Sequence, residues 1–306
     1  MRAYAKKITI FFAMVMLVTM FAGCNTHKFA ETENSLIVSA EELKDYIGKE
    51  NVVIVDMQST EGYATGHVEG AVNIQNEDIT INVPVNTMLT SAKKIAKLMG
   101  SKGISNDTLV IAYDTNKMSA SRLLWSLFMY GHENVKVVDG GLDAIVAAGI
   151  TLTTAEPAVT ETTFTTNEPS QNWLATKKEV LELVNNPDPN VILLDVRTQE
   201  EYYTEGKIPT SVMIDWTNNF YSVDNTFKSV QTTRINYLEE GIYPEQEIII
   251  YCKSSMRATP VFVQLYEAGY RNIRIFDGAF LEWSSDSSNP IEMPEGAKAP
   301  TKADAS

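Results

Sequence analysis

The sequence predicts an α/β protein made of two tandem domains, each with a mostly parallel sheet flanked by helices. Two observations predict this fold. Short apolar runs, such as VILLD at 191–195 and EIIIY at 247–251, are continuous in Val, Ile and Leu, which is typical of parallel strands buried on both faces. Segments of helical pattern, such as TKKEVLELVNN at 176–186, lie between these runs. Strands that alternate with helices favour a parallel sheet, because each helix returns the chain to the same edge.

An internal repeat is the third observation, and it predicts that the domain is duplicated. NVVIVD at 51–56 recurs as NVILLD at 190–195, and TLVIAYDTNKMSAS from 108 is matched by EIIIYCKSSMRAT from 247. Asp114 is thereby aligned with Cys252, and Gly131 with Gly269, since both pairs are 138 residues apart (252 minus 114, 269 minus 131). Self-similarity at a fixed spacing indicates repeated structural units.

The repeat also sets the expected boundaries. The first domain is expected over residues 36–155 and the second over 172–290, joined by a Pro/Thr/Glu-rich linker at 156–171. The polar tail at 291–306 is expected to be flexible because it contains little that a core could bury. A chain of 306 residues is long enough for a full core in each domain.

The composition is that of an acidic globular protein. Hydrophobic residues make up 44% of the chain and charged residues 21%, with a formal net charge of −14. An excess of negative charge argues against nucleic acid as a partner, because a grip on phosphate needs clustered cations. The same argument excludes a broad electrostatic contact with anionic lipid.

The N-terminus resembles a bacterial lipoprotein signal. A short basic stretch at Arg2, Lys6 and Lys7 precedes the apolar run 8–22, and the segment FAGC at 21–24 leads from this run to Cys24. The run is shorter than the ~20 residues of a spanning helix. We expect a signal peptide at 1–23, a lipid on Cys24 as the only membrane contact, and a tether at 24–35 that holds the protein at the extracytoplasmic face of the cell membrane. An ordinary secreted protein or an uncleaved anchor are the alternatives.

Cys252 is the candidate nucleophile. With Cys24 modified it is the sole remaining thiol, so it has no partner for an intramolecular disulfide. It ends an apolar strand and precedes a helix expected to begin near Arg257 or Ala258, and ligands of parallel sheets bind at the carboxyl ends of strands. Backbone N–H groups of such a loop stabilise an anion, which favours a reactive thiolate. The alternative is a small buried hydrophobe, a frequent role for cysteine.

Several motifs together resemble the tandem-domain rhodanese family of thiosulfate and 3-mercaptopyruvate sulfurtransferases. The resemblance covers about residues 36–290. It depends on sequence segments in both halves of the chain: VDMQSTEGYATGHVEGAVNI at 55–74, LLDVRTQEEY at 193–202, GKIPTSVMI at 206–214, CKSSMR at 252–257 and RIFDGAFLEW at 274–283.

The resemblance implies a catalytic second domain and an inert first domain, in which Asp114 stands in place of the cysteine and Ser119 in place of Arg257. It implies sulfur transfer through a Cys252 persulfide, from thiosulfate in preference to 3-mercaptopyruvate, to a cyanide or thiol acceptor, without metal or cofactor and as a monomer. The implied site residues are the persulfide-stabilising loop and two supporting residues: Lys253, Ser254, Ser255, Met256, Arg257, Asp195 and Arg197.

One residue departs from the family pattern, and several residues outside the loop have other expected roles. Glu201 stands near the place where related animal enzymes carry a substrate-binding arginine, so Lys253 and Arg257 are expected to meet an anionic donor. Arg197 is expected in a structural ion pair, His67 in a structural role, and the segment with Arg122 and Trp125 either near the cleft between the domains or in simple packing.

Two other functions stay open at this point. A Cdc25-like phosphatase or arsenate reductase also has a Cys–Arg loop, but with five intervening residues, whereas four (253–256) separate Cys252 from Arg257 here. The shorter loop suits a single sulfur atom better than a tetrahedral oxyanion. A surface lipoprotein that carries sulfur without turnover, or that only binds partners, is the second alternative.

Overall fold

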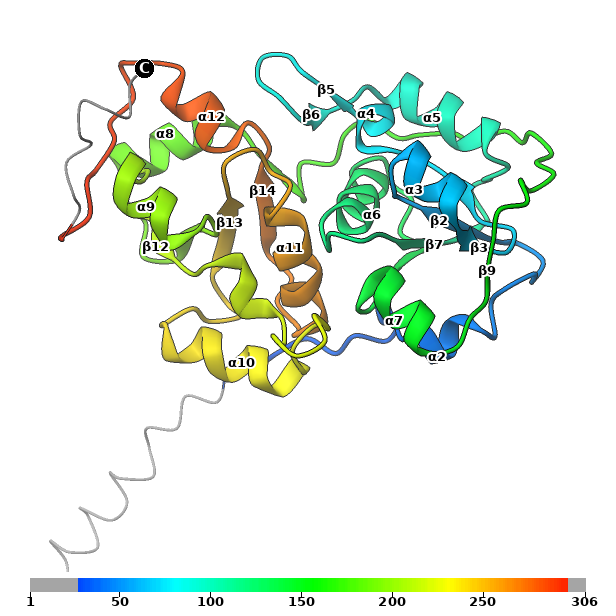
Figure 1. Ribbon diagram of the computed structural model, residues 1–306. Helices are drawn as coiled ribbons and strands as arrows, with labels where there is room; N and C mark the ends of the chain where they lie inside the picture. The colour runs from blue at the N-terminus through cyan, green and yellow to red at the C-terminus, as the bar shows by residue number, and fades with distance from the viewer. Residues whose placement is uncertain (1–26, 297–306) are drawn as a thin grey trace, which may run out of the picture.

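The computed structural model describes residues 27–296. Figure 1 shows two α/β domains side by side, the first in blue to green and the second in yellow-green to red. The predicted signal peptide and Cys24, the predicted site of a lipid, lie outside the described residues, as does the last part of the predicted tail. Within residues 27–296 no helix has the length and apolar character needed to cross a membrane.

The sheet of the first domain is entirely parallel, with the strand order β1-β8-β7-β2-β4. Its strands are β1 (Ile37–Val38), β2 (Val52–Asp56), β4 (Val72–Asn73), β7 (Leu109–Tyr113) and β8 (Val135–Val138). Two small antiparallel pairs join β3 (His67–Val68) to β9 (Leu152–Thr153) and β5 (Thr80–Ile81) to β6 (Met88–Leu89). The β5–β6 pair projects from the domain as a hairpin (Figure 1).

Short helices cover this sheet: α2 (Ala40–Leu43), α3 (Thr60–Thr65), α4 (Asn76–Ile79), α5 (Ala92–Ser101), α6 (Ser119–Met129) and α7 (Gly141–Ala147). At the starts of α2, α3 and α5, a serine side chain accepts a backbone N–H of the first turn; the three serines are Ser39, Ser59 and Ser91. Such caps satisfy donors that the first helical turn leaves free. Helix α6 differs because all of its residues are buried.

The second domain repeats the architecture of the first. Its parallel sheet has the order β10-β14-β13-β11-β12, formed by β10 (Leu174–Ala175), β11 (Val191–Asp195), β12 (Val212–Met213), β13 (Glu247–Tyr251) and β14 (Ile273–Phe276). The helices are α8 (Lys177–Asn185), α9 (Gln199–Glu205), the 3-10 helix η1 (Trp216–Asn219), α10 (Val230–Glu239), α11 (Ala258–Glu267) and α12 (Ala279–Ser284). The expected fold class is therefore confirmed in both halves.

A shared core fixes one domain against the other. Helix α6 packs on α11, and the rings of Phe128 and Phe262 meet edge to face with 6.1 Å between centroids. The indole of Trp125, fully buried, donates to the carbonyl of Trp173 at 3.3 Å. Because this interface is apolar and belongs to the same cluster of buried residues as both sheets, it holds the domains in one arrangement.

The segments outside the two predicted domains also contact them. Of the predicted tether, His27 stacks on Tyr243 with 4.2 Å between centroids, and the amide of Ala30 donates to the carbonyl of Gly269 at 3.0 Å. These residues therefore lie along the second domain, although their polar sequence suggested a free segment. At the start of the predicted tail, Glu292 exchanges two backbone hydrogen bonds with Lys207, at 2.9 and 3.0 Å.

The interdomain linker runs along the first domain. Phe164 is buried, and the amide of Thr162 donates to the carbonyl of Gly100 at 2.9 Å. Farther along, the amide of Asn167 donates to the carbonyl of Tyr130 at 3.0 Å. Fixed backbone contacts of this kind leave the linker little freedom to let the domains move apart.

Candidate active site

The Cys252–Arg257 loop joins β13 to α11 at the carboxyl end of the central strand. Helix α11 begins directly after Arg257, as the sequence predicts. The chain at Ser255 turns through the left-handed region with φ 64°, and its hydroxyl donates to the carbonyls of Phe276 and Asp277. The amide of Phe280 donates to the carbonyl of Cys252 at 3.0 Å. The loop is thus held in a tight turn by the segment that follows β14.

The thiol of Cys252 is fully buried beneath this turn. Arg257, at the other end of the loop, lies near enough to this side chain for their charges to interact. Burial by itself would lower the pKa of Arg257, but its bonds to Glu201 and the proximity of Cys252 raise it above the ordinary value. A permanently charged guanidinium therefore lies next to the sulfur.

The corresponding loop of the first domain shows where its amides point. One carboxylate oxygen of Asp114 accepts the N–H of Lys117 at 2.8 Å, and the other accepts the N–H of Ala120 at 2.8 Å. Burial raises the pKa of Asp114, and these N–H bonds act in the opposite direction. An anionic group at the first position of the loop thus receives hydrogen bonds from the loop backbone, as in other anion-binding nests.

The two loops share this turn. Lys117 has φ 65° and stands 138 residues before Ser255, which has φ 64°; Ala120 stands 138 residues before Ala258. The amides of 255 and 258 therefore correspond to those that bind the carboxylate in the first domain. In the second domain the first position carries sulfur in place of a carboxylate.

Arg257 is held by Glu201 from α9. Its two terminal nitrogens bind the two carboxylate oxygens, at 2.5 and 2.7 Å. Burial alone would raise the pKa of Glu201, but the bonds from Arg257, followed by those from Thr198, lower it to about 2. Glu201 also caps its own helix with Thr198, from which it accepts a backbone and a hydroxyl hydrogen bond. The bidentate pair fixes the guanidinium in one orientation.

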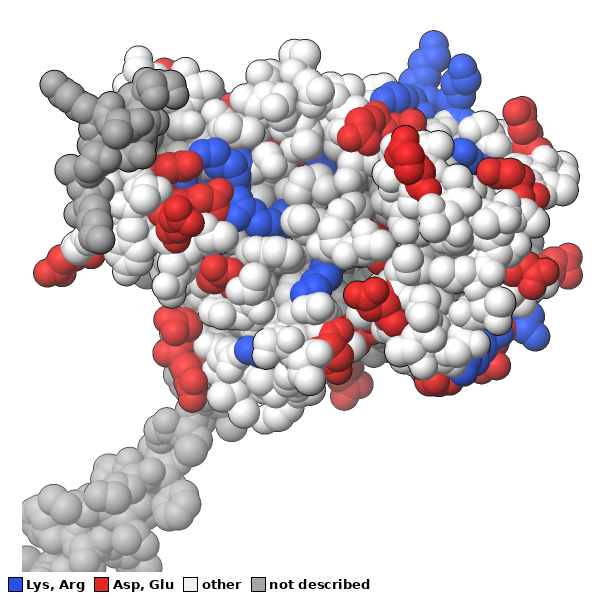
Figure 2. Space-filling view, in the orientation of Figure 1, with Lys and Arg blue, Asp and Glu red and all other residues white. Residues whose placement is uncertain are grey.

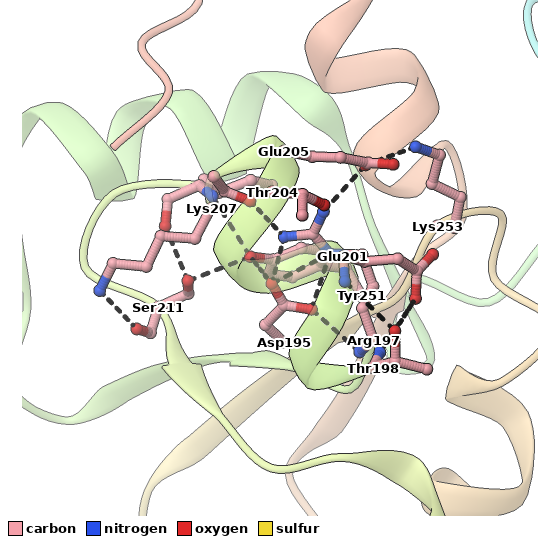
Figure 3. A network of polar contacts seen from close by, with 12 residues as sticks. Asp195, Arg197, Thr198, Glu201, Thr204, Glu205, Lys207, Ser211, Tyr251 and Lys253 are labelled. Carbon is pink, nitrogen blue, oxygen red and sulfur yellow. Dashed lines mark hydrogen bonds and ion pairs between the residues drawn. The ribbon is translucent and has the colours of Figure 1, made fainter. Parts of the chain in front are cut away.

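Lys253, the other cation of the loop, is also paired. Its ammonium group lies 2.5 Å from Glu205, one turn after Glu201 on α9 (Figure 3). Glu205 also lies 3.3 Å from Arg197. Lys253 and Arg257 are therefore each bound to a carboxylate, and the expectation that they meet an anionic donor stays a prediction. The signal in the sequence is the spacing of Glu201 and Glu205, which places both on one helix face.

Arg197 and Asp195 form a buried ion pair behind the loop. The guanidinium is fully buried, lies 2.7 Å from the Asp195 carboxylate and donates to the carbonyl of Gly206 at 2.6 Å (Figure 3). Its carbon lies 3.9 Å from the ring centre of Phe280. The hydroxyl of Tyr251, the last residue of β13, donates to Asp195 at 2.8 Å. These contacts position the end of the strand that carries Cys252.

The first domain covers the loop with its β5–β6 hairpin. The hydroxyl of Thr87 donates to the carbonyl of Ser254, and Arg122 of α6 donates to the carbonyl of Thr87 at 2.7 Å. Arg122 also lies 2.8 Å from Asp277, which accepts the amide of Leu89 at 2.7 Å. Arg122 is thus part of the interface beside the site. No local pattern in the sequence indicates that the hairpin reaches across the interface.

The same arrangement recurs around Asp114 with the domains exchanged. The segment 220–228 of the second domain covers the loop of the first: Lys117 donates to the side chain of Asn225 at 2.6 Å, and Asp139 accepts the amide of Phe227 at 2.8 Å. Asp139 and Asp277 are equivalent in the repeat, so the cover is pseudosymmetric. The first domain, however, has Ser119 in place of the loop arginine.

Other predicted residues of the first domain have structural contacts. His67 is buried, with its ring nitrogens 2.8 and 3.1 Å from the carbonyls of Tyr63 and Ala155. Gln58 stands where the second domain has Arg197, and its side chain donates to Asp56 at 2.9 Å. Among residues 27–296 no cluster of His, Cys, Asp and Glu is arranged to hold a metal ion.

Comparison with known proteins gives the family. Residues 39–148 and 176–286 each match the rhodanese-like domain. The chain is 28% identical over 278 residues to a protein of Mycolicibacterium smegmatis named "Putative thiosulfate sulfurtransferase", covering 85% of this chain and 98% of that protein. It is 31% identical over 251 residues to the "Sulfur carrier protein TtuD" of Thermus thermophilus, covering 76% and 87%.

Solved structures give the same fold. An anaerobic ergothioneine biosynthesis enzyme from Chlorobium limicola is similar with a TM-score of 0.76 at 21% identity, covering 84% of this chain and 70% of that one. The structure of YnjE is similar with a TM-score of 0.76 at 22% identity, covering 85% and 68%. With two matched segments that account for most of its length, the chain belongs to the rhodanese family, as a tandem of two rhodanese-like domains.

Proposed function

We propose that this protein moves a sulfane sulfur from thiosulfate, or from 3-mercaptopyruvate, to a thiophilic acceptor through a persulfide on Cys252. Family membership and the names of its relatives support sulfurtransferase activity in general. The observation that carries the finer proposal is the position of Cys252 at the start of a loop with the same turn as its counterpart in the first domain, which holds a carboxylate by backbone N–H bonds. A thiolate or persulfide at that position is an anion in an anion-binding turn.

The reaction is a double displacement. The Cys252 thiolate attacks the outer sulfur of thiosulfate; an S–S bond forms to the protein, the S–S bond of the donor breaks, and its electron pair leaves with sulfite. An acceptor such as cyanide or a thiolate then attacks the outer sulfur of the persulfide and restores the thiolate. Covalent catalysis of this kind divides the transfer into two steps and gives ping-pong kinetics.

The loop contributes by stabilising both anions. Amides that are already oriented need no rearrangement as charge moves from Sγ to the outer sulfur. Arg257 adds a positive charge near the sulfur, and Glu201 fixes the orientation of its guanidinium. Because the thiol is fully buried, a donor reaches it only when a covering group moves. The β5–β6 hairpin is such a group, since Thr87 links it to the loop by a hydrogen bond to Ser254.

The phosphatase alternative is disfavoured by the same geometry. An arginine that binds a tetrahedral oxyanion donates from two guanidinium nitrogens to two oxygens of the substrate. In this protein the two terminal nitrogens of Arg257 are bound to the two carboxylate oxygens of Glu201. We therefore expect sulfur transfer from thiosulfate to cyanide to exceed hydrolysis of an aryl phosphate, and the reverse ranking would favour the phosphatase.

Sulfur carriage is a second candidate function. The observation that favours it is the similarity to a protein named as a sulfur carrier. A carrier and an enzyme share the Cys252 persulfide and differ in the second step. In a carrier, the persulfide forms with thiosulfate but passes to cyanide only slowly, whereas the enzyme turns over repeatedly.

Steady-state kinetics test the proposal. Thiocyanate formation is followed while thiosulfate and cyanide are varied together, with 3-mercaptopyruvate as the second donor. Parallel double-reciprocal lines and complete loss of transfer in Cys252→Ser are expected. Intersecting lines, or transfer that survives in Cys252→Ser, would refute the double displacement.

We further propose that the protein is attached to the outer face of the cell membrane through a lipid on Cys24. The support is the basic, apolar and FAGC pattern of residues 2–24. Expressed in a bacterial host, the wild-type protein is expected in the membrane fraction and Cys24→Ala outside it. Equal membrane retention of the two proteins would refute lipid attachment.

A further inference from the structure

The charges around Cys252 balance. Three cations lie in and behind the loop: Lys253, Arg257 and Arg197. Each lies within 3.3 Å of a carboxylate from residues 195–205, the segment that contains α9. The carboxylates are also three: Asp195, Glu201 and Glu205. Three positive charges minus three negative charges leave a local sum of zero, and the Arg122–Asp277 pair beside the loop does not change it, because it adds one charge of each sign.

The pairs that face the loop are partly shielded from water. The side chains of Arg257 and Glu201 are 17% and 22% exposed, and those of Lys253 and Glu205 are 32% and 34% exposed. Water therefore screens the charges incompletely, and each carboxylate cancels much of the attraction that its partner would exert on an anion. Figure 2 shows the same mixture on the surface, where blue and red side chains of the second domain adjoin each other.

A neutral site discriminates among sulfane donors by their charge. Thiosulfate carries two negative charges and must leave water without any compensating excess of positive charge, which is costly. An organic thiosulfonate has the same sulfur skeleton with one oxygen replaced by carbon, and carries one negative charge. Its transfer to Cys252 forms the same S–S bond, breaks the donor S–S bond and releases a sulfinate with the electron pair.

We propose that Glu201 and Glu205 set the donor class of this site by lowering its selectivity for thiosulfate relative to singly charged sulfane donors such as organic thiosulfonates. The two glutamates act through Arg257 and Lys253 and touch no reacting atom, so they are specificity-determining residues. This inference rests on the proposed sulfur transfer through Cys252. Removal of either carboxylate leaves an unbalanced cation beside the sulfur and favours the doubly charged donor.

The experiment compares thiosulfate with methanethiosulfonate, two donors of matched shape that differ by one charge. For each protein the ratio of kcat/KM for thiosulfate to kcat/KM for methanethiosulfonate is measured with cyanide as acceptor. The intrinsic reactivity of each donor cancels when this ratio is compared between variants. Glu201→Gln is a suitable variant because glutamine also serves at this position of a helix cap.

Glu200→Gln is the matched control. Glu200 lies on the same helix and carries the same charge, but it is exposed and forms no ion pair among the described residues. Glu201→Asp is the second control, because it shortens the side chain and keeps the charge. If the ratio changed in Glu201→Gln only because the loop was damaged, it would change in Glu201→Asp as well.

The ratio is expected to rise about three- to tenfold in Glu201→Gln, as expected for removal of one partly shielded charge near the donor. A smaller rise is expected in Glu205→Gln, a larger one in the double variant, and less than a twofold change in Glu200→Gln and Glu201→Asp. The rise should shrink at 0.5 M salt. An unchanged ratio in both Gln variants, with both donors still used, would overturn this inference alone. If neither donor transfers sulfur to the wild-type protein, the proposed function itself fails.

Discussion

The side chain of Thr87, in the first domain, donates a hydrogen bond to the carbonyl of Ser254, in the cysteine loop of the second domain. This bond connects the β5–β6 hairpin to the loop, and Arg122 holds the hairpin from behind by donating to the carbonyl of Thr87 at 2.7 Å. The first domain thus forms part of the cover over the buried thiol. The first domain therefore helps to enclose the candidate site of the second domain.

Removal of this bond should expose the thiol. Thr87→Val keeps the shape of the side chain and loses the donor. A hydrogen bond contributes about 0.5–1.5 kcal/mol, so opening of the cover should become about two- to tenfold more frequent. The rate at which iodoacetamide alkylates Cys252 should rise by the same factor.

The repeat provides the control for this prediction. Asn225→Ala removes the equivalent contact over the first domain, where Lys117 donates to Asn225 at 2.6 Å. Alkylation of Cys252 should not change in this variant. An equal rise in the alkylation rate of both variants would mean that each substitution loosens the whole interface between the domains.

The ion pair of Glu201 predicts a pH dependence of stability. The pKa of Glu201 is lowered from 4.5 to about 2, because the bonds from Arg257 outweigh the effect of burial. A carboxylate with a depressed pKa contributes its full stability above about pH 4.5 and loses it as the pH falls toward 2. The contribution is roughly 1–3 kcal/mol, after allowance for partial exposure.

Urea unfolding of Glu201→Gln and of the wild-type protein should therefore differ more at pH 6 than at pH 3. The difference in unfolding free energy should narrow by about 1–2 kcal/mol between these pH values. Glu200→Gln should follow the wild-type protein at both pH values. A difference that is constant from pH 6 to pH 3 would show that the pair does not depress the pKa of this carboxyl.

The Asp195–Arg197 pair predicts a graded effect of substitution. Arg197→Met leaves a buried carboxylate unpaired and should lower the free energy of unfolding by about 3–5 kcal/mol. Arg197→Gln should cost less, because Gln58 already occupies this place in the first domain and donates to Asp56 at 2.9 Å. Denaturant unfolding followed by circular dichroism would measure both variants, and equal losses would contradict the equivalence of the two positions.

Asp114 predicts a separation of stability from activity. Asp114→Ala leaves the amides of Lys117 and Ala120 without their acceptor and should destabilise the protein by about 1–3 kcal/mol. Sulfur transfer at Cys252 should stay within about twofold of wild type, because the two loops lie in different domains. Asp107→Ala, a change at an exposed position, should alter neither property. Loss of transfer in Asp114→Ala would assign the first loop a part in the reaction.

Much of the fold follows from local sequence patterns. The continuous apolar runs correspond to β11 and β13, and the alignment of Asp114 with Cys252 gives the same position in both domains. The start of α11 after Arg257 was also predictable, because a polar turn separates the strand from a helical pattern. These features depend on neighbours in the chain, and periodicity records such neighbours well.

The partners of the loop residues could not be predicted from the sequence. Glu201 and Thr198 have the spacing of a helix cap, which predicts the start of α9 but says nothing about Arg257, more than fifty residues away. The contact between Thr87 and Ser254 joins two domains and has no local signature at all. Such contacts are set by how the sheets pack together, so the sequence revealed the loop cations without the carboxylates that balance them.

The central claim, that Cys252 carries the transferred sulfur, is tested most directly by mass spectrometry. The protein is incubated anaerobically with thiosulfate, freed of small molecules and analysed whole and as peptides. The account predicts a gain of about 32 Da, one sulfur atom, on the peptide that contains Cys252, lost on addition of cyanide and absent in Cys252→Ser. An unmodified Cys252 in a protein that still forms thiocyanate would contradict the account.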